Sequence, residues 1–460
     1  MKSLAHVLAV PYPAQGHVIP MMEFAKKLVH RGCKVTFANT DFIHRRITNA
    51  MSSKEDDNCG NGLKLVSIPD GLEHGDDRLN LEKLTGSMQR VMPRKLEELI
   101  RKAKNDENRR FTCVVAEGGT GWALEVAKRM EIKTVSFCPV SASTAAVACS
   151  IPKLIEDGII DGSDGTILKK QSFNIAPTMP VISTSAFAWA CFDDMMTRKS
   201  LFKLTAKSNE FVEKFADYKI CNSANELEPD AFSLLPELLP VGPLLASSKL
   251  GNQGGNFWAK DSDCLSWLDQ QPARSVIYVA FGSFTAFNKK QFQELALGLE
   301  LTNKPFLWVA RPGITLKATA EGDYPQGYKE RIGSRGKIVS WAPQEKVLRH
   351  PSVACFVSHC GWNSTIEGVS NGVPFLCWPY FADQYLNESY ICDVWKIGLR
   401  FEKDKGGIIR QGEFKKKVDQ LLGDEHFKAT AMDLKEKIVN SVQSGCSYKN
   451  LSNVIDWIRD

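Results

Sequence analysis

The sequence contains no hydrophobic run long enough to span a membrane and no long run of lysine or arginine. A short apolar stretch near the N-terminus is interrupted by Pro11 and Pro13, so it also falls short of transmembrane length. The formal net charge of +5 is small for 460 residues, and so weak a bias disfavours nucleic acid as a partner. We therefore expect a protein that neither inserts into a membrane nor binds nucleic acid.

The 13 cysteines are odd in number and lack the spacing of metal-ligand pairs. Several lie within apolar runs, where a thiol behaves as a small hydrophobic group: Cys113, Cys138, Cys355 and Cys377. This usage is typical of a reducing compartment. The sequence thus predicts a soluble cytoplasmic protein without a metal site.

The hydrophobic pattern predicts alternating strands and helices. Short β-branched runs predict strands in the first part of the chain at residues 5–10, 34–38, 111–116 and 134–137, with helices at 18–30 and 122–130. The pattern breaks at the glycine-rich stretch Pro240–Asn256. It resumes with strands at 276–280, 306–310, 337–340, 353–357 and 374–378. We expect an α/β protein with two doubly wound, Rossmann-like domains facing across a cleft, with ligands at the carboxyl ends of the strands.

The strongest functional pattern lies between Trp341 and Gln384. Val353 to Ser358 is predicted to be a buried strand, residues 359–361 a turn, and Asn363 or Ser364 the cap of a following helix. The first N–H groups of a helix lack backbone partners and carry partial positive charge, so they stabilise a phosphate without a metal ion. Gly361 in the turn would let the backbone approach that phosphate closely.

Side chains around this turn suit the other parts of a nucleotide sugar. His359 can donate to a diphosphate, and Glu367, one helical turn further along, can accept from two hydroxyls such as those of a ribose. A flat aromatic at Trp341 opens the segment, and the pair Asp383 and Gln384 closes it. An ordinary strand–turn–helix with a polar cap would explain the central residues alone. The whole span in this order favours a nucleotide-sugar donor site.

This segment resembles, without a gap, the plant secondary product glycosyltransferase signature of the family one UDP-glycosyltransferases. Residues 11–22 and 264–284 are also similar to that family, so the resemblance covers nearly the whole chain. It implies that Trp341 stacks on uracil, that Ala342 and Gln344 fix the uridine, and that Glu367 holds the ribose. It also implies that Asp383 and Gln384 hold sugar hydroxyls and that His359, Asn363 and Ser364 hold the diphosphate, with Ser283 as a further phosphate contact and Gly361 and Trp362 among the donor-binding residues.

The resemblance further implies the GT-B fold and a domain plan. We expect an acceptor-binding domain at 1–240, a linker at 241–262, a UDP-sugar domain at 263–440 and a helix at 441–460 that returns to the first domain. A final Gln in the motif accompanies glucose donors in this family, so Gln384 favours UDP-glucose as co-substrate. The family needs no metal or other cofactor.

His17 is the candidate catalytic base. It follows the first predicted strand, and a neutral histidine can take the proton of an acceptor hydroxyl if a carboxylate holds its other nitrogen. From the local sequence alone, His17 capping the next helix is the simpler interpretation, but the family base lies in this motif. After the strand at 111–116, where the family usually has Asp, this chain has Glu117. We expect Glu117 to pair with His17 and to tune or weaken activity; the alternative is that Glu117 points away and leaves His17 to act alone or with little effect.

Two other patterns resemble ligand-binding motifs, but we interpret both as structural. Asp261-Ser262-Asp263 has the form of a metal-binding Asp-x-Asp pair, but it precedes a short helix and fits capping better. Gly118-Gly119-Thr120-Gly121 lacks the third glycine and the later acid of a dinucleotide loop.

The acceptor side is expected to be apolar. Aromatic and methionine side chains could line an adaptable pocket, although each is equally suited to the core; these are Met88, Phe187, Trp189, Phe192, Phe284 and Phe381. The sequence therefore predicts a monomeric, inverting, metal-independent glucosyltransferase that acts on a hydroxyl of a small hydrophobic plant metabolite. The alternatives are a protein that binds UDP-sugar with weak or no transfer, because of Glu117, and an epimerase or phosphorylase on the same fold.

Overall fold

The computed structural model describes residues 4–50, 62–78, 80–104, 106, 109–192, 194–247, 263–315 and 323–460. The chain divides into two compact units. Unit 1 contains the described residues up to 247 together with 381–383 and 440–460, and unit 2 contains 263–380 and 384–439. Most of the predicted linker, residues 248–262, lies outside the described residues, as do Asp261 and Ser262.

Unit 1 is built on a seven-stranded parallel sheet in the order β3-β2-β1-β4-β5-β8-β9. Its strands are β1 (His6–Val10), β2 (Lys34–Thr40), β3 (Leu63–Ile68), β4 (Cys113–Ala116), β5 (Lys133–Cys138), β8 (Tyr218–Cys221) and β9 (Leu238–Pro240). The sequence of β1, HVLAV, is apolar at nearly every position because both faces of the strand are covered. Val7 and Ala9 face one core and Leu8 and Val10 the other.

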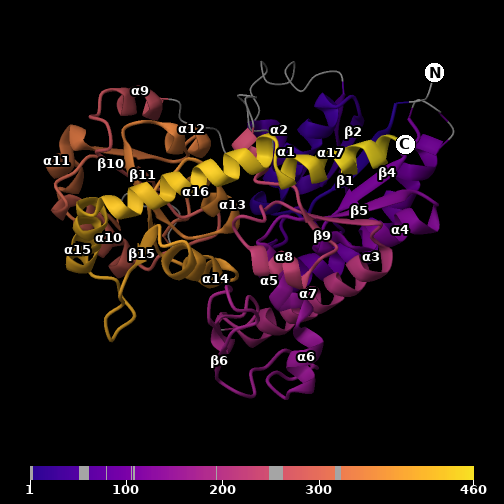
Figure 1. Cartoon of the computed structure of the whole chain (residues 1–460), viewed down its shortest axis with the longest axis horizontal. Coiled ribbons are helices and arrows are strands. Elements are labelled where there is room, and N and C mark those ends of the chain that lie inside the picture. The colour runs from indigo at the N-terminus through magenta and orange to yellow at the C-terminus, as the bar shows by residue number, and fades with distance from the viewer. Residues whose placement is uncertain are drawn as a thin grey trace. The chain divides into compact units, whose positions relative to one another are not determined.

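Helices cover both faces of this sheet. The first core packs against α1 (Gln15–His30) and α17 (Cys446–Arg459), which lie beside β1 in Figure 1. The second core packs against α3 (Leu81–Lys104) and α4 (Trp122–Arg129). The remaining helices of the unit are α2 (Asp41–Ala50), α5 (Ala142–Cys149), α6 (Ile151–Glu156), α7 (Met195–Phe215) and α8 (Pro229–Leu234).

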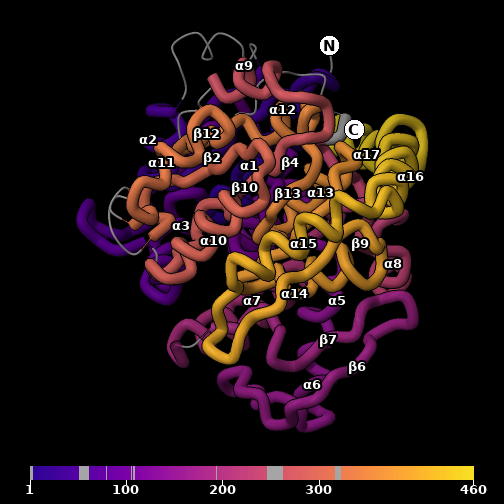
Figure 2. The backbone as a smooth tube through the Cα atoms, turned by 90° about the vertical axis from the view of Figure 1, so that its left-hand side faces the viewer, coloured from indigo at the N-terminus to yellow at the C-terminus, as the bar shows by residue number. Residues whose placement is uncertain are grey.

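A segment without a place in the sheet projects from unit 1 between α5 and α7. It contains α6 and a two-stranded antiparallel ribbon of β6 (Ser172–Phe173) and β7 (Ile182–Ser183), and it lies at the bottom of Figure 2, below α5 and α7. An aromatic cluster of Phe173, Phe187, Trp189 and Phe202 holds it to α7.

Unit 2 is built on a six-stranded parallel sheet in the order β12-β11-β10-β13-β14-β15. The strands are β10 (Val276–Ala280), β11 (Phe306–Val309), β12 (Gly336–Val339), β13 (Val353–Ser358), β14 (Phe375–Cys377) and β15 (Gly398–Arg400). The helices are α9 (Asp263–Asp269), α10 (Lys289–Leu301), α11 (Tyr328–Ile332), α12 (Gln344–Arg349), α13 (Trp362–Ser370), α14 (Gln384–Ser389) and α15 (Gln411–Gly423), and α16 (Glu425–Gln443) lies in this unit up to residue 439.

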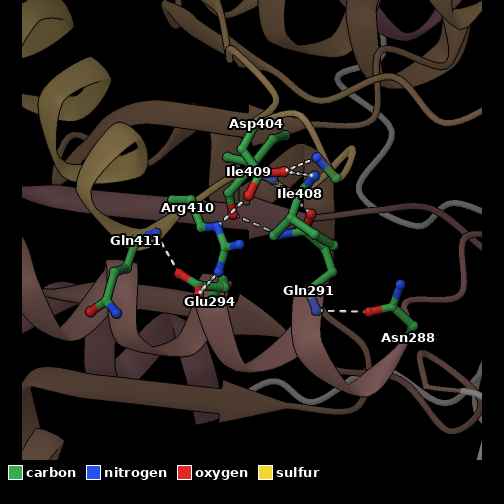
Figure 3. A network of polar contacts seen from close by, with 9 residues as sticks. Asn288, Gln291, Glu294, Asp404, Ile408, Ile409, Arg410 and Gln411 are labelled. Carbon is green, nitrogen blue, oxygen red and sulfur yellow. Dashed lines mark hydrogen bonds and ion pairs between the residues drawn. The ribbon is translucent and has the colours of Figure 1, made fainter.

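A polar network joins α10 to the segment that precedes α15 (Figure 3). The amide of Gln291 exchanges two hydrogen bonds with the backbone of Ile409, at 2.9 and 3.0 Å. Glu294 accepts from the Arg410 guanidinium at 2.9 Å and from the Gln411 backbone N–H at 2.8 Å. These contacts fix α10, so they also anchor the loop between β10 and α10.

The expected fold class, two doubly wound α/β domains, is confirmed. The nine predicted strands are present with ends shifted by up to two residues, but the first helix begins at Gln15 rather than near residue 18. His17 therefore lies in the first turn of α1, behind Ala14 as N-cap. Among the described residues, no helix combines the length and the apolar character that crossing a bilayer requires.

Candidate active site

In each sheet the proposed functional residues follow two neighbouring strands whose connections run in opposite directions. In unit 1 these strands are β1 and β4, and in unit 2 they are β10 and β13. Such a switch point separates the two loops at the carboxyl edge of a sheet and leaves room for a ligand. His17 and Glu117 follow the first pair of strands, and Ser283 and His359 follow the second.

The structure brings His17 and Glu117 into direct contact. Nδ1 of His17 hydrogen-bonds to the Glu117 carboxylate, whose side chain is only 2% exposed. The other carboxylate oxygen accepts from the Tyr12 backbone N–H at 3.4 Å. The Thr120 hydroxyl accepts from the Glu117 N–H at 3.2 Å and donates to the Val10 carbonyl at 2.8 Å, which ties this turn to β1. The carboxylate is thus held in place from several sides.

This contact determines how His17 can act. An ionised carboxylate can only accept, so Nδ1 carries the proton, and the other ring nitrogen, Nε2, is left with a lone pair in the neutral imidazole. Burial lowers the pKa of His17. The charge and hydrogen bond of Glu117, with a smaller contribution from the Asp383 carboxylate, together raise the pKa by more than burial lowers it, so it lies above its ordinary value. The His17 side chain remains 34% exposed. The pair has the geometry of a general base held by a carboxylate.

In unit 2 the turn after β13 has a different cap from the one expected. The cap of α13 is Gly361, with no side-chain cap bond, and Asn363 and Ser364 lie inside the first turn. The expectation that one of these two side chains caps the helix was wrong, because the chain already enters the helix at Trp362. Cys360 turns the backbone with a φ of 63°. A helix start without a side-chain cap leaves its end accessible to an external anion.

His359 is packed between two glycines. A Cβ built on Gly282 would lie 2.5 Å from Nε2 of His359, and one built on Gly361 would lie 2.6 Å from the same atom. Both positions therefore require glycine for the imidazole to fit. Burial, with a smaller contribution from the Arg311 charge, lowers the pKa of His359 to about 4, so the ring is neutral near pH 7. A neutral ring can donate one hydrogen bond without adding charge.

Arg311 is a residue of this site that the sequence analysis missed. It follows β11, is 5% exposed, and donates to the carbonyls of Gly282, Thr285 and Pro312. Its contacts clamp the loop that carries Ser283. Its place in the sequence could have revealed it. Arg311 directly follows the apolar run FLWVA, and an arginine at the end of a buried strand is seldom enclosed unless it has specific partners.

The proposed ribose and uridine residues form a connected network. The Gln344 side-chain amide donates to the Ser364 hydroxyl at 2.8 Å and to the Glu367 carboxylate at 2.5 Å, and its oxygen accepts from the Tyr278 hydroxyl at 3.2 Å. The start of α12 is thereby joined to the first turns of α13. Next to Gln344, Ala342 is buried and Trp341 is partly exposed, whereas the Trp362 side chain packs in the interior.

The end of the motif is divided between the units. Residues 381–383 belong to unit 1, whereas Gln384 begins α14 in unit 2, and its side-chain oxygen accepts from the Tyr380 backbone N–H at 2.7 Å. Ala382, immediately before Asp383, has a φ of 56° and donates its N–H to the sulfur of Cys191 at 2.9 Å. Cys191 is a second residue that sequence reasoning missed.

The six candidate acceptor residues fall into two groups. Met88, Phe187 and Trp189 are at most 2% exposed and pack in the interior of unit 1, so the structure gives them no surface for an acceptor. Phe192 and Phe381 are partly exposed and lie with ring centroids 5.7 Å apart. Phe284, in unit 2, is 47% exposed.

Comparison with known proteins identifies the class. Residues 234–440 match the family model described as UDP-glucoronosyl and UDP-glucosyl transferase. The chain is 44% identical to UDP-glycosyltransferase 83A1 of Arabidopsis thaliana over 463 residues, covering 99% of this chain and 97% of that protein. The chain belongs to the plant family one UDP-glycosyltransferases.

Solved structures agree with this assignment. A UDP-glucosyltransferase from Polygonum tinctorium capable of glucosylating indoxyl matches all of both chains with a TM-score of 0.81 and 27% identity. UGT2 of Phytolacca americana, complexed with UDP-2-fluoro-glucose and pterostilbene, matches with a TM-score of 0.78 and 26% identity over 99% of this chain and 100% of that chain. The fold is therefore GT-B. The protein is a hexosyltransferase that glycosylates small metabolites, and enzymes of this family are inverting and metal-independent.

Proposed function

We propose that the protein transfers glucose from UDP-glucose to a hydroxyl group of a small hydrophobic plant metabolite, such as a phenol or a terpenoid. The observation that carries the proposal is the hydrogen bond between Nδ1 of His17 and the buried Glu117 carboxylate. This bond prepares Nε2 of His17 to accept a proton. The solved relative that binds UDP-2-fluoro-glucose supports glucose as the sugar, and Gln384 at the end of the motif agrees with it.

The reaction is a single displacement. Nε2 of His17 takes the acceptor proton while the hydroxyl oxygen forms a bond to the anomeric carbon. The bond between that carbon and the UDP oxygen breaks on the opposite face, and its electron pair leaves with UDP. Glu117 stabilises the imidazolium that forms. An α-linked donor therefore gives a β-glucoside.

The proposed donor roles are those of the sequence motif, and the open start of α13 in unit 2 supports the one at its centre. We assign the diphosphate to the start of α13, at Gly361, Asn363 and Ser364, together with the side chains of His359 and Ser283, and keep Trp362 as a donor-binding residue without a separate role. Fixed dipoles at such a site stabilise the charge that develops on the leaving group. Glu367 holds the ribose, and Trp341, Ala342 and Gln344 hold the uridine. Asp383 and Gln384 bind the sugar hydroxyls.

The acceptor is assigned to partly exposed aromatic side chains. Phe192 and Phe381 in unit 1 offer apolar surface that a flat or greasy acceptor would bury favourably, and Phe284, which is exposed on unit 2, stays a separate candidate. Met88, Phe187 and Trp189 are left out of this assignment because their side chains are enclosed in the interior.

The test is turnover with a defined acceptor panel. The protein is incubated with UDP-glucose and a set of phenols, terpenoids and fatty acids, and products are detected by mass spectrometry alongside released UDP. We expect a product about 162 mass units heavier than at least one acceptor, which is the mass of one added anhydrohexose. UDP release should depend on that acceptor. His17→Ala should abolish this release. UDP-glucose binding without release, with any acceptor, would instead identify a protein that binds the donor and does not transfer it.

A further inference from the structure

Arg311 is a buried cation whose partners are all main-chain carbonyls. Its guanidinium donates to Gly282 at 3.0 Å, to Pro312 at 3.1 Å and to Thr285. Within the described residues no carboxylate pairs with it, although it is 5% exposed. Burial lowers its pKa to about 10, so it stays charged at neutral pH. A buried charge without a counterion is costly and calls for an explanation.

The surroundings of Arg311 point to an anion. Two of its carbonyl partners, Gly282 and Thr285, enclose Ser283, and Gly282 also packs against the imidazole of His359. The Thr285 hydroxyl and Nδ1 of His359 are both buried without a hydrogen-bond partner. A cation and two polar atoms that lack partners therefore lie around the loop that connects β10 to α10.

We propose that Arg311 is the positioning residue and fixed countercharge of the diphosphate site. It holds the 282–285 loop against His359, and its positive field stabilises both the bound diphosphate and the UDP that leaves. This inference rests on the proposed function and adds a cation to a site otherwise made of helix amides and neutral side chains. Attraction between Arg311 and a diphosphate is strong here because burial keeps water from screening it. The uridine end of the donor gains nothing from this field.

The test compares UDP with uridine, which differ only in the diphosphate. Binding of each ligand is measured by calorimetry for the native protein, Arg311→Met, Arg311→Lys and the control Arg331→Met. Arg331 is an exposed arginine paired with Glu300, and its replacement by methionine changes the net charge by the same amount. We expect Arg311→Met to weaken UDP binding by about 30-fold and uridine binding by less than about 2-fold. Arg331→Met should change neither.

Arg311→Lys separates charge from packing. Lysine keeps the positive charge but loses the planar fork that reaches several carbonyls, so UDP affinity should fall between those of the native protein and Arg311→Met. The dependence of UDP affinity on salt should also be steeper in the native protein than in Arg311→Met. Thermal unfolding identifies a variant that fails to fold, and Arg311→Lys then carries the comparison.

The outcomes are distinct. An equal loss of UDP and uridine affinity in the Arg311 variants would show that Arg311 supports the fold of unit 2 and not the diphosphate, and no loss of either would show that it contributes nothing to the site; either result would overturn the proposal. Failure of the native protein to bind UDP at all would instead overturn the proposed function.

Discussion

Nδ1 of His17 and the carboxylate of Glu117 are hydrogen-bonded at the carboxyl ends of β1 and β4, although Glu117 is one methylene longer than the aspartate usual in this family. The contact forms because the Glu117 backbone is tied to β1 through Thr120 and its carboxylate is buried beside Tyr12. The longer side chain therefore reaches the histidine in this fold. Its consequence for catalysis can be measured directly.

Removing the charge of Glu117 tests its role first. Glu117→Gln keeps the size of the side chain but cannot stabilise an imidazolium as a carboxylate does, so we expect kcat to fall by about 10²-fold. Steady-state rates with a saturating acceptor measure this. Glu210→Gln, at an exposed position on α7, is the matched control and should leave kcat unchanged. Native-like kcat in Glu117→Gln would remove Glu117 from the mechanism.

Shortening the same side chain tests the geometry. In Glu117→Asp the carboxylate recedes by one methylene while the turn stays fixed by Thr120, so we expect kcat to fall by about 10-fold. An increase in kcat would show the opposite, that the native pair is impaired by the extra methylene.

The pH dependence of kcat/KM follows from the raised pKa of His17. The base must be neutral to take a proton, so activity rises with pH as His17 loses its own proton. Because the Glu117 carboxylate raises this pKa above its ordinary value of 6.5, the acid limb should have its midpoint above pH 6.5. Glu117→Gln should move the midpoint to lower pH. A midpoint that is the same in both proteins would contradict the pairing.

Much of the fold could be predicted from the sequence because parallel strands that are buried on both faces leave continuous apolar runs such as those of β1, β4 and β13. β3 was not predicted because its side chains are only partly buried. β6 and β15, with two and three residues, are too short to show a hydrophobic period. The motif likewise located the turn at His359.

What the sequence could not show is which side chains face one another. Methionine and tryptophan are residue types that often line ligand pockets. Met88 and Trp189 are nevertheless buried in the interior, because they pack against residues distant in the chain. Arg311 contacts Gly282 from 29 residues away, and Cys191 contacts Ala382 from 191 residues away, so neither pair leaves a local pattern. The cap of α13 was misplaced because the left-handed residue that ends the turn is Cys360, a residue type that gives no such signal.

Removal of divalent metal is expected to leave turnover unchanged. The charge of the diphosphate is met in our proposal by helix amides and Arg311, so the reaction needs no Mg²⁺ or Mn²⁺. Initial rates measured with EDTA and after dialysis against a chelator check this, with the same protein resupplied with Mg²⁺ as control. Loss of activity that Mg²⁺ restores would contradict it.

Gly361→Ala tests the packing of His359. The backbone of Gly361, with φ −61° and ψ 142°, accepts alanine, so the effect is steric: the new Cβ would lie 2.6 Å from Nε2 of His359. The ring must move, and we expect UDP affinity to fall by at least about 10-fold. Gly412→Ala is the control, because a Cβ added at Gly412 would have nothing within 4 Å. For this variant we expect no loss of UDP affinity and a gain in the free energy of unfolding of about 0.5 kcal/mol. Equal UDP affinity in both variants would show that His359 does not contribute.

Cys191 is expected to position Asp383 through the neighbouring Ala382. The cysteine sulfur accepts the N–H of Ala382, whose φ of 56° is unfavourable for alanine and must be held by its surroundings. Cys191→Ala removes that acceptor. A lost hydrogen bond of about 1 kcal/mol corresponds to a KM for UDP-glucose raised by about 5-fold.

The effect should be confined to the sugar, because Asp383 is assigned to sugar hydroxyls. Binding of UDP itself should therefore be unchanged in Cys191→Ala, and Cys191→Ser, which restores an acceptor oxygen, should recover most of the native KM. Cys149→Ser, at an exposed cysteine, controls for loss of a thiol. A parallel loss of UDP and UDP-glucose affinity would mean that Cys191 supports the fold of unit 1 rather than the position of Asp383.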